Sequence, residues 1–214
     1  MVRIIVAALI VACAPGVLGY RASLQRATAV RPLATPGTPL AVASRAPSPV
    51  ALVVDEDYKL AGSFFAIGAL VLVAPWVVGV PFVFFGLFLA FQTLRIRFVF
   101  DDDAFEVKTK PLEDLFSSEL TATGDNFAVG GDNRWSYDSF VNYDFFPSVD
   151  LPVLVYFKET QTPQDKWDMG PGKWANGAEA LAKGAAKGQV HFFPCIAKAD
   201  VLKEQFAAKG CAKL

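Results

Sequence analysis

Hydrophobic residues form one long uninterrupted run in the first half of the chain. The 35 consecutive residues of 60–94 carry no formal charge. As a single helix this run would extend roughly 50 Å at about 1.5 Å per residue, well beyond the roughly 30 Å hydrocarbon core of a bilayer. Three residues that favour a turn lie near its centre: Pro75, Gly79 and Pro81. The run therefore predicts two transmembrane helices near 60–76 and 80–94, and a single tilted and kinked span is the alternative.

Basic residues flank the two ends of this run, and its centre carries none. Lys59 precedes the run, and Arg95 and Arg97 follow it. Because positively charged flanks tend to stay on the side of synthesis or import, both ends are expected on the same side of the membrane. A lipid bilayer is thus the first partner that the sequence predicts.

The remaining chain, 96–214, is predicted to be a β-rich domain closed by one helix. Residues 96–101 and 105–109 alternate between apolar and polar on either side of an Asp-rich turn, which predicts a β-hairpin. Further strands are predicted over 127–129 and 134–137 (a second hairpin), 140–146, 151–158 and 190–196. A long loop, 160–189, includes an Ala-rich stretch over 178–187 that favours a short helix. The final helix is predicted between Asp200 as N-cap and Gly210 as the C′ stop. The expected fold class is α+β: a transmembrane helical hairpin followed by this domain.

Residues 1–54 differ sharply in composition from the rest of the chain. They contain five Arg but no Asp, Glu, Lys or Phe, so the chain from Asp55 onward has 15 basic and 21 acidic residues. Residues 1–19 have the basic start, apolar run and small-residue close of a signal peptide. Residues 20–54, rich in Ala, Ser, Thr and Pro, are typical of a plastid transit peptide or a disordered segment. The alternative is a plain secretory leader with a Pro-rich linker.

Composition and motifs argue against several classes of function. With 53% hydrophobic and 19% charged residues and a net charge of −1, the chain does not have the basic character of a nucleic-acid binder. Phosphate-binding loops and nucleophile elbows are absent from the sequence, so we expect neither an enzyme nor a cofactor or metal site. The single His191 is predicted to be structural, and Lys158 and Glu159 to lie at the surface. Cys195 and Cys211 are interpreted as two packing thiols, with a regulatory disulfide as the alternative.

An aromatic stretch over 135–146 is the most distinctive part of the domain. Its rings either build the core or leave one face exposed as a protein-docking patch, since exposed aromatic surface marks interaction sites. The candidate protein-contact residues are Asn133, Arg134, Trp135, Tyr137 and Asn142.

Four blocks of the sequence resemble a known family: Arg97–Asp101, Asn133–Pro147, Val155–Pro163 and Gln189–Pro194. They are similar to an uncharacterised family of cyanobacterial and plastid membrane proteins. A series of strands closed by one helix, directly after a two-helix membrane hairpin, also resembles bacterial membrane proteins with pleckstrin-homology-like domains. The resemblance implies a photosynthetic membrane setting and brings no activity to particular residues.

Together these features predict an integral thylakoid membrane protein whose 96–214 domain lies in the stroma. We expect an accessory protein that acts by protein–protein contacts in photosystem assembly or stability. A stoichiometric small subunit of a photosynthetic complex and a membrane-anchored lipid-binding module are the alternatives.

Overall fold

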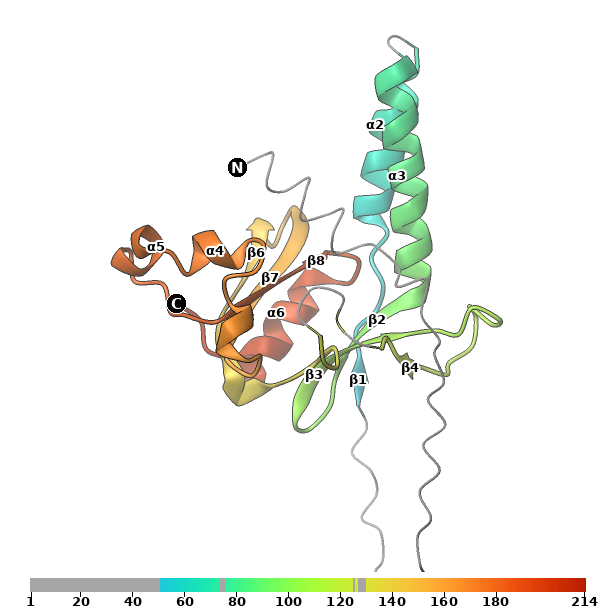
Figure 1. Cartoon of the computed structure of the whole chain (residues 1–214). Helices are drawn as coiled ribbons and strands as arrows, with labels where there is room; N and C mark the ends of the chain where they lie inside the picture. The colour runs from blue at the N-terminus through green and yellow to red at the C-terminus, as the bar shows by residue number, and fades with distance from the viewer. Residues whose placement is uncertain (1–50, 74–75, 125, 127–129) are drawn as a thin grey trace, which may run out of the picture.

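The computed structural model describes residues 51–73, 76–124, 126 and 130–214, and it places them in a pair of helices and an α+β domain (Figure 1). The signal and transit peptides predicted within 1–50 lie outside the described residues, as does the strand predicted over 127–129. The end of the predicted 20–54 segment is folded, because Leu52 and Val53 form strand β1 and Val54 is buried. The domain therefore includes residues that precede the apolar run as well as the predicted 96–214.

The apolar run forms two helices, α2 (Lys59–Val71) and α3 (Trp76–Arg95). They pack antiparallel, since positions late in α3 lie beside positions early in α2. Glycines make the contact close: a Cβ built on Gly79 would lie 2.6 Å from the Leu72 backbone nitrogen, and one on Gly68 would lie 2.5 Å from the Val83 nitrogen. The predicted outer ends, 60 and 94, agree to within one residue, but the inner ends were wrong by four or five residues: α2 stops at Val71, and α3 starts at Trp76 and includes Pro81 in its second turn.

The first sheet follows directly from α3. Strands β2 (Ile96–Phe100) and β3 (Ala104–Thr109) form the predicted antiparallel hairpin, with Phe98 opposite Val107. Strand β1 pairs with the other edge of β2, and β4 (Thr121–Ala122) and β5 (Arg134–Ser136) both pair with β3. No residue separates the end of α3 from the start of β2, so the sheet begins where the helix stops.

The second sheet is a meander of three antiparallel strands in the order β6-β7-β8. Its strands are β6 (Phe140–Pro147), β7 (Pro152–Glu159) and β8 (Gln189–Pro194), close to the three strands that alternation predicts. A short 3-10 helix, η1 (Tyr137–Ser139), connects it to β5.

Helix α6 (Ala199–Ala208) closes the core that the two sheets share. Its Phe206 ring lies 5.2 Å from Phe100 and Phe105 of the first sheet and 5.0 Å from Tyr143 of the second, measured between ring centroids. Gly210 has a φ of +72°, as expected for the residue that stops the helix. The predicted N-cap was wrong: Lys198 occupies that position, and Asp200 lies in the first turn.

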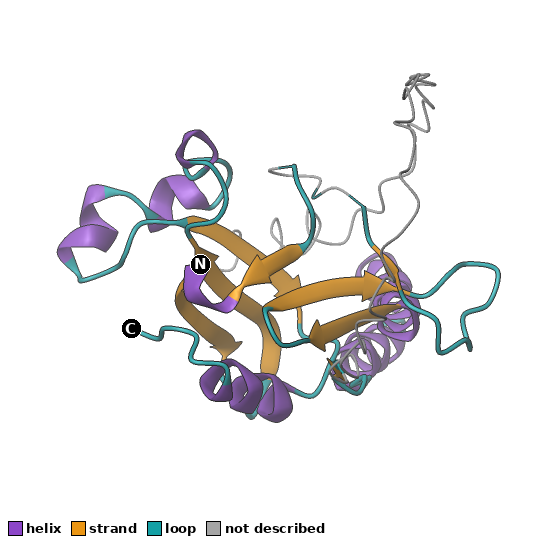
Figure 2. Cartoon of the chain, turned by 90° about the horizontal axis from the view of Figure 1, so that it is seen from below, coloured by secondary structure: helices purple, strands orange, loops and turns teal. Residues whose placement is uncertain are grey.

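The segment between β7 and β8 lies at the end of the domain away from the helix pair. Figures 1 and 2 show α4 (Gly172–Ala175) and α5 (Ala178–Ala182) at one end of the domain and α2 and α3 at the other. Helix α5 confirms the short helix predicted within 178–187, and η2 (Gln164–Lys166) adds a single 3-10 turn.

Candidate functional site: an apolar helix pair fixed to the domain

The outward faces of α2 and α3 are apolar. Large hydrophobic side chains project from them into the surroundings: Phe65, Ile67, Leu70, Trp76, Phe84 and Leu87. A pair of helices without a polar face does not suit water, because a helix at the surface of a soluble domain normally carries polar residues on its outer side. The pair therefore presents an apolar surface to its surroundings.

The two helices differ in the length of bilayer that they could cross. By length and composition α3, with 20 residues, is the one helix among the described residues that could span a membrane. It would extend about 30 Å, and the 13 residues of α2 about 20 Å. Of the two predicted spanning helices, α3 has both the length and the apolar composition to cross a membrane, whereas α2 has only the composition.

The last turns of α3 are buried against the domain. Thr93 is fully buried, and its Oγ1 donates a hydrogen bond to the Leu89 carbonyl at 2.8 Å. Arg97, just beyond the helix, is 5% exposed, and its guanidinium donates to the carbonyls of Thr93 (2.8 Å) and Ile96 (2.7 Å). A cation in this position satisfies carbonyls that a helix end leaves without partners and complements the helix dipole.

Arg97 also joins the chain that enters α2 to the chain that leaves α3. Its Nη2 lies 3.2 Å from Glu56 Oε1. The prediction that Arg97 is a flanking interface charge is therefore corrected, since this guanidinium is buried and paired inside the protein. Lys59 remains at the surface at the start of α2, because its side chain is 86% exposed; its ammonium forms an ion pair with Asp57 at 3.1 Å.

The segment that precedes α2 is bonded to the domain on both sides. The Val54 nitrogen donates to the Phe98 carbonyl of β2, and the Asp57 nitrogen donates to the Ile196 carbonyl, each at 2.9 Å. On the same side, the Lys198 ammonium and the Asp55 carboxylate are 2.7 Å apart. These bonds, together with the direct α3–β2 connection, fix the base of the helix pair to the domain.

The predicted protein-contact residues lie in and beside β5 and in β6, and each makes contacts within the domain. Asn133, Arg134 and Asn142 are partly buried. The Asn133 side chain bonds to the side chains of Asn126 and Thr123 at 2.9 and 2.8 Å. Arg134 forms ion pairs with Asp101 and with Glu106. Burial alone would raise the pKa of Asp101, but hydrogen bonds from Arg134 and from backbone amides lower it to about 2.

The two aromatic residues of that predicted patch belong to the core. Trp135 is 2% exposed, and the Tyr137 hydroxyl lies 2.7 Å from the carbonyls of both Asp101 and Ala104. Asn142 accepts a hydrogen bond from the backbone nitrogen of Leu214. The core interpretation therefore holds for both rings, and neither ring is exposed to serve the predicted docking patch.

A buried Glu159–His191 pair fastens the end of β7 to β8, a feature that the sequence analysis missed. Glu159 is fully buried, and its Oε1 lies 2.8 Å from His191 Nε2. Thr162 donates to both carboxylate oxygens, through its hydroxyl at 2.7 Å and its backbone nitrogen at 2.8 Å. Burial would raise the pKa of Glu159, but these hydrogen bonds lower it; burial lowers the pKa of His191. The arrangement is a neutral imidazole that donates to an ionised carboxylate, so His191 is structural as predicted, and the surface position predicted for Glu159 was wrong.

Lys158 was also wrongly predicted to lie at the surface. It is 2% exposed, and its ammonium donates to the carbonyls of Ala175 (3.0 Å) and Ala186 (2.7 Å). Burial lowers its pKa. This lysine therefore holds the segment that contains α4 and α5, from which Trp174 projects with 63% of its surface exposed.

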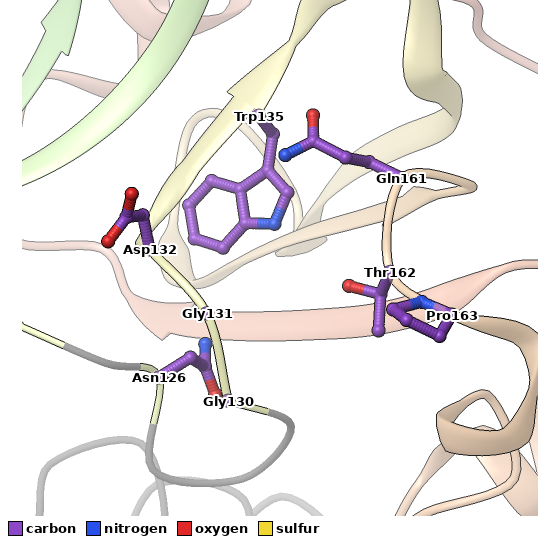
Figure 3. A pocket seen from close by; sticks show the side chains of 8 residues that line it. All are labelled: Asn126, Gly130, Gly131, Asp132, Trp135, Gln161, Thr162 and Pro163. Carbon is purple, nitrogen blue, oxygen red and sulfur yellow. The ribbon is translucent and has the colours of Figure 1, made fainter.

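A small pocket of about 120 Å³ opens beside Trp135. Figure 3 shows the indole of Trp135 between Asp132 and Gln161, with Thr162 and Pro163 on the opposite wall. This volume accommodates a few water molecules. Gln161 is already used there, because its Oε1 accepts a hydrogen bond from the Ser136 nitrogen and its Nε2 donates to the Arg134 carbonyl.

Metal-ligating and thiol groups are dispersed in the part of the chain that the structure describes. Within it, no group of three or more His, Cys, Asp or Glu residues could hold a metal ion. Cys195 and Cys211 are both free and buried, and burial raises the pKa of each thiol to about 12. The structure thus favours the packing-thiol interpretation over a disulfide.

The fold and the site define an α+β protein with two antiparallel sheets and one helix that is long and apolar enough to cross a membrane. Residues 52–210 match the family described as "Protein of unknown function (DUF3119)", and the chain belongs to that family. The predicted relationship to an uncharacterised family is therefore confirmed. Comparison with curated proteins and with solved structures gives no match.

Proposed function

We propose that this protein is an integral accessory protein of the plastid thylakoid membrane, which acts by protein–protein contacts in photosystem assembly or stability. The observation that carries the proposal is the apolar helix pair that continues into β2 without a linker. Such a connection would hold the domain at a fixed height above the membrane. The two sheets closed by α6 further support a pleckstrin-homology-like architecture, in which a domain offers surface rather than a catalytic centre.

The proposed location rests on composition and on charge. The acid-free residues 1–51, which precede β1, support plastid import, and the basic Lys59 at the base of α2 supports a stromal position for the domain. Because α2 and α3 are antiparallel, both of their domain-side ends would face the same compartment.

The surface that would meet a partner differs from the one expected from sequence. Trp174 is the largest exposed aromatic side chain at the end of the domain away from the helix pair, and Met169 nearby is 41% exposed. The buried Lys158 ammonium fixes the backbone around them. Large apolar side chains on a braced surface segment are typical of protein-contact sites. We therefore assign the contact with a photosynthetic membrane complex to this segment.

The test is co-migration of the full chain with membrane complexes after mild solubilisation. We expect the protein to migrate with a photosystem complex or an assembly intermediate of it, and Trp174→Ala to shift it towards the free protein. Phe116→Ala is the matched control, because Phe116 is also exposed but lies in the loop after β3. Sub-stoichiometric amounts relative to core subunits would distinguish an assembly factor from a permanent subunit. Migration only as a free monomer, with unchanged photosystem levels in cells that lack the protein, would contradict the proposal and favour the lipid-binding alternative.

A further inference from the structure

We propose that the domain makes a second contact with the membrane, through the turn between β6 and β7, and that the bilayer surface covers Leu151. This inference rests on the proposed membrane anchoring by the helix pair and extends it to a named part of the domain. It follows from the position of the turn, from the side chains it exposes and from the charges around it.

The position of the turn is set by contacts at the base of the helix pair. Leu60, Ala61 and Leu89 form a small buried cluster where the pair meets the domain, and Val153 of β7 packs against this cluster. Lys59 immediately precedes Leu60 and is the first charged residue below the apolar run. The start of β7 therefore lies at the level where the apolar surface gives way to charge, which is the level of the membrane surface.

The turn continues from this level on the side of the helix pair. Figure 1 shows β6 and β7 meeting on the side of the domain from which α2 and α3 rise. Leu151 lies two residues before Val153 and is 67% exposed. Its backbone nitrogen donates to Ser148 Oγ at 3.2 Å, so the turn holds the exposed leucine in place. Phe146, at the other side of the turn, is also exposed.

The charges around the turn define the depth of the contact. Asp150, directly before Leu151, is exposed and would resist transfer into hydrocarbon. Lys59, on the neighbouring helix base, is placed to reach anionic headgroups. A hydrophobic side chain that follows an exposed carboxylate, close to the level at which Lys59 begins α2, fits the headgroup boundary, where apolar tips enter only shallowly. The contact is therefore with the interfacial layer of the bilayer.

The experiment uses environment-sensitive fluorescent labels on single cysteines in the full chain with Cys13→Ser. Cys195 and Cys211 are buried and would label slowly. The protein is reconstituted into vesicles of phosphatidylcholine and phosphatidylglycerol that contain lipids with a nitroxide near the headgroup or deep in the acyl chain. Three positions are compared: Leu151→Cys at the turn, Phe84→Cys on the outer face of α3, and Asp102→Cys in the exposed β2–β3 turn as the matched control. Asp150→Cys is a second probe of the same turn in case Leu151→Cys does not fold.

We expect the label at 84 to be quenched by the deep nitroxide, the label at 151 by the shallow one with a blue shift of its emission, and the label at 102 by neither. Quenching at 84 without quenching at 151 or 150 would overturn the second contact and leave the proposed anchoring intact. Equal quenching at 151 and 102 would overturn it as well, because the label would then report the vesicle surface in general. A label at 84 that no nitroxide quenches would overturn the anchoring itself, and the second contact with it.

Discussion

Replacing Gly86 by alanine should weaken the contact between α2 and α3. A Cβ built on Gly86 would lie 2.6 Å from the Phe65 nitrogen, 2.9 Å from the Phe65 Cα and 3.0 Å from the Ala61 carbonyl oxygen. All three are backbone atoms, which cannot rotate away as a side chain can. The added methyl group can therefore be accommodated only if the two helices move apart.

The magnitude follows from two opposing effects. Forcing packed elements apart costs about 1–3 kcal/mol, and alanine recovers about 0.5–1 kcal/mol over glycine within a helix. Central values of about 2 and about 0.75 kcal/mol predict that Gly86→Ala lowers the free energy of unfolding by about 1 kcal/mol, with an upper bound of about 2.5 kcal/mol. Gly62→Ala is the matched control in α2, because a Cβ on Gly62 would meet no atom within 4 Å. That control should be neutral or stabilise the protein by up to about 1 kcal/mol.

The assay is a dodecyl sulfate titration of the full chain in non-ionic micelles, followed by circular dichroism. We expect the transition of Gly86→Ala at a lower dodecyl sulfate fraction than that of the unmodified chain, and the transition of Gly62→Ala at the same fraction or a higher one. If both variants unfolded together with the unmodified chain, the close packing of α2 against α3 would be refuted.

Three further predictions concern the domain. Arg97→Met removes the guanidinium that pairs with Glu56, and methionine offers no replacement for its hydrogen bonds to two backbone carbonyls. In a denaturant titration the free energy of unfolding should fall by about 1–3 kcal/mol, and an unchanged value would exclude the pairing. Burial lowers the pKa of His191 in the folded protein below its ordinary value of 6.5. Below pH 6.5 the unfolded chain therefore binds a proton at His191 that the folded protein does not, so the free energy of unfolding should fall as the pH drops through 6.5. The lowered pKa of Glu159 adds a further loss of stability below its ordinary value of 4.5. In melting temperatures measured against pH, His191→Gln should flatten the fall near pH 6.5, and an unaltered slope there would contradict the assignment. The Cys195 thiol, with a pKa of about 12, should resist iodoacetamide at about pH 8 until the protein unfolds, and rapid alkylation of the native chain would show that it is accessible.

Elements defined by local patterns could be predicted from sequence. The β2–β3 hairpin combines large apolar residues at every second position with an Asp turn, in which Asp101 Oδ1 accepts hydrogen bonds from the nitrogens of Asp103 and Ala104. The end of α6 was equally predictable, because only the conformation of Gly210 is needed to stop it. Only the inner limits of α2 and α3 were missed, because the middle of the apolar run carries no charged residue to mark where a helix ends, and Pro81 in an early turn interrupts only one hydrogen bond.

The burial of side chains in the candidate site could not be predicted from sequence, because contacts between distant parts of the chain determine it. Glu159 looks like a surface residue until His191, 32 residues later, reaches its carboxylate. Lys158, its neighbour on the other face of β7, is buried only because the segment around Ala175 folds back over it. Whether Trp135 faces a partner or the core is decided by the second sheet, which places the rings of Phe157 and His191 within 5 Å of it. Alternation along one strand does not contain this information, because it cannot say which faces of the sheet are covered.

Limited proteolysis of sealed thylakoids is the most direct test of the proposed anchoring. A protease added from the stromal side should digest residues 96–214 of the domain and leave a protected fragment that contains the uncharged run 60–94. Disruption of the membrane with detergent should then remove the protection of that fragment. Complete digestion of intact membranes without a protected fragment would show that the helix pair is not in the bilayer. Full protection of the domain would place it on the lumenal side and contradict the account.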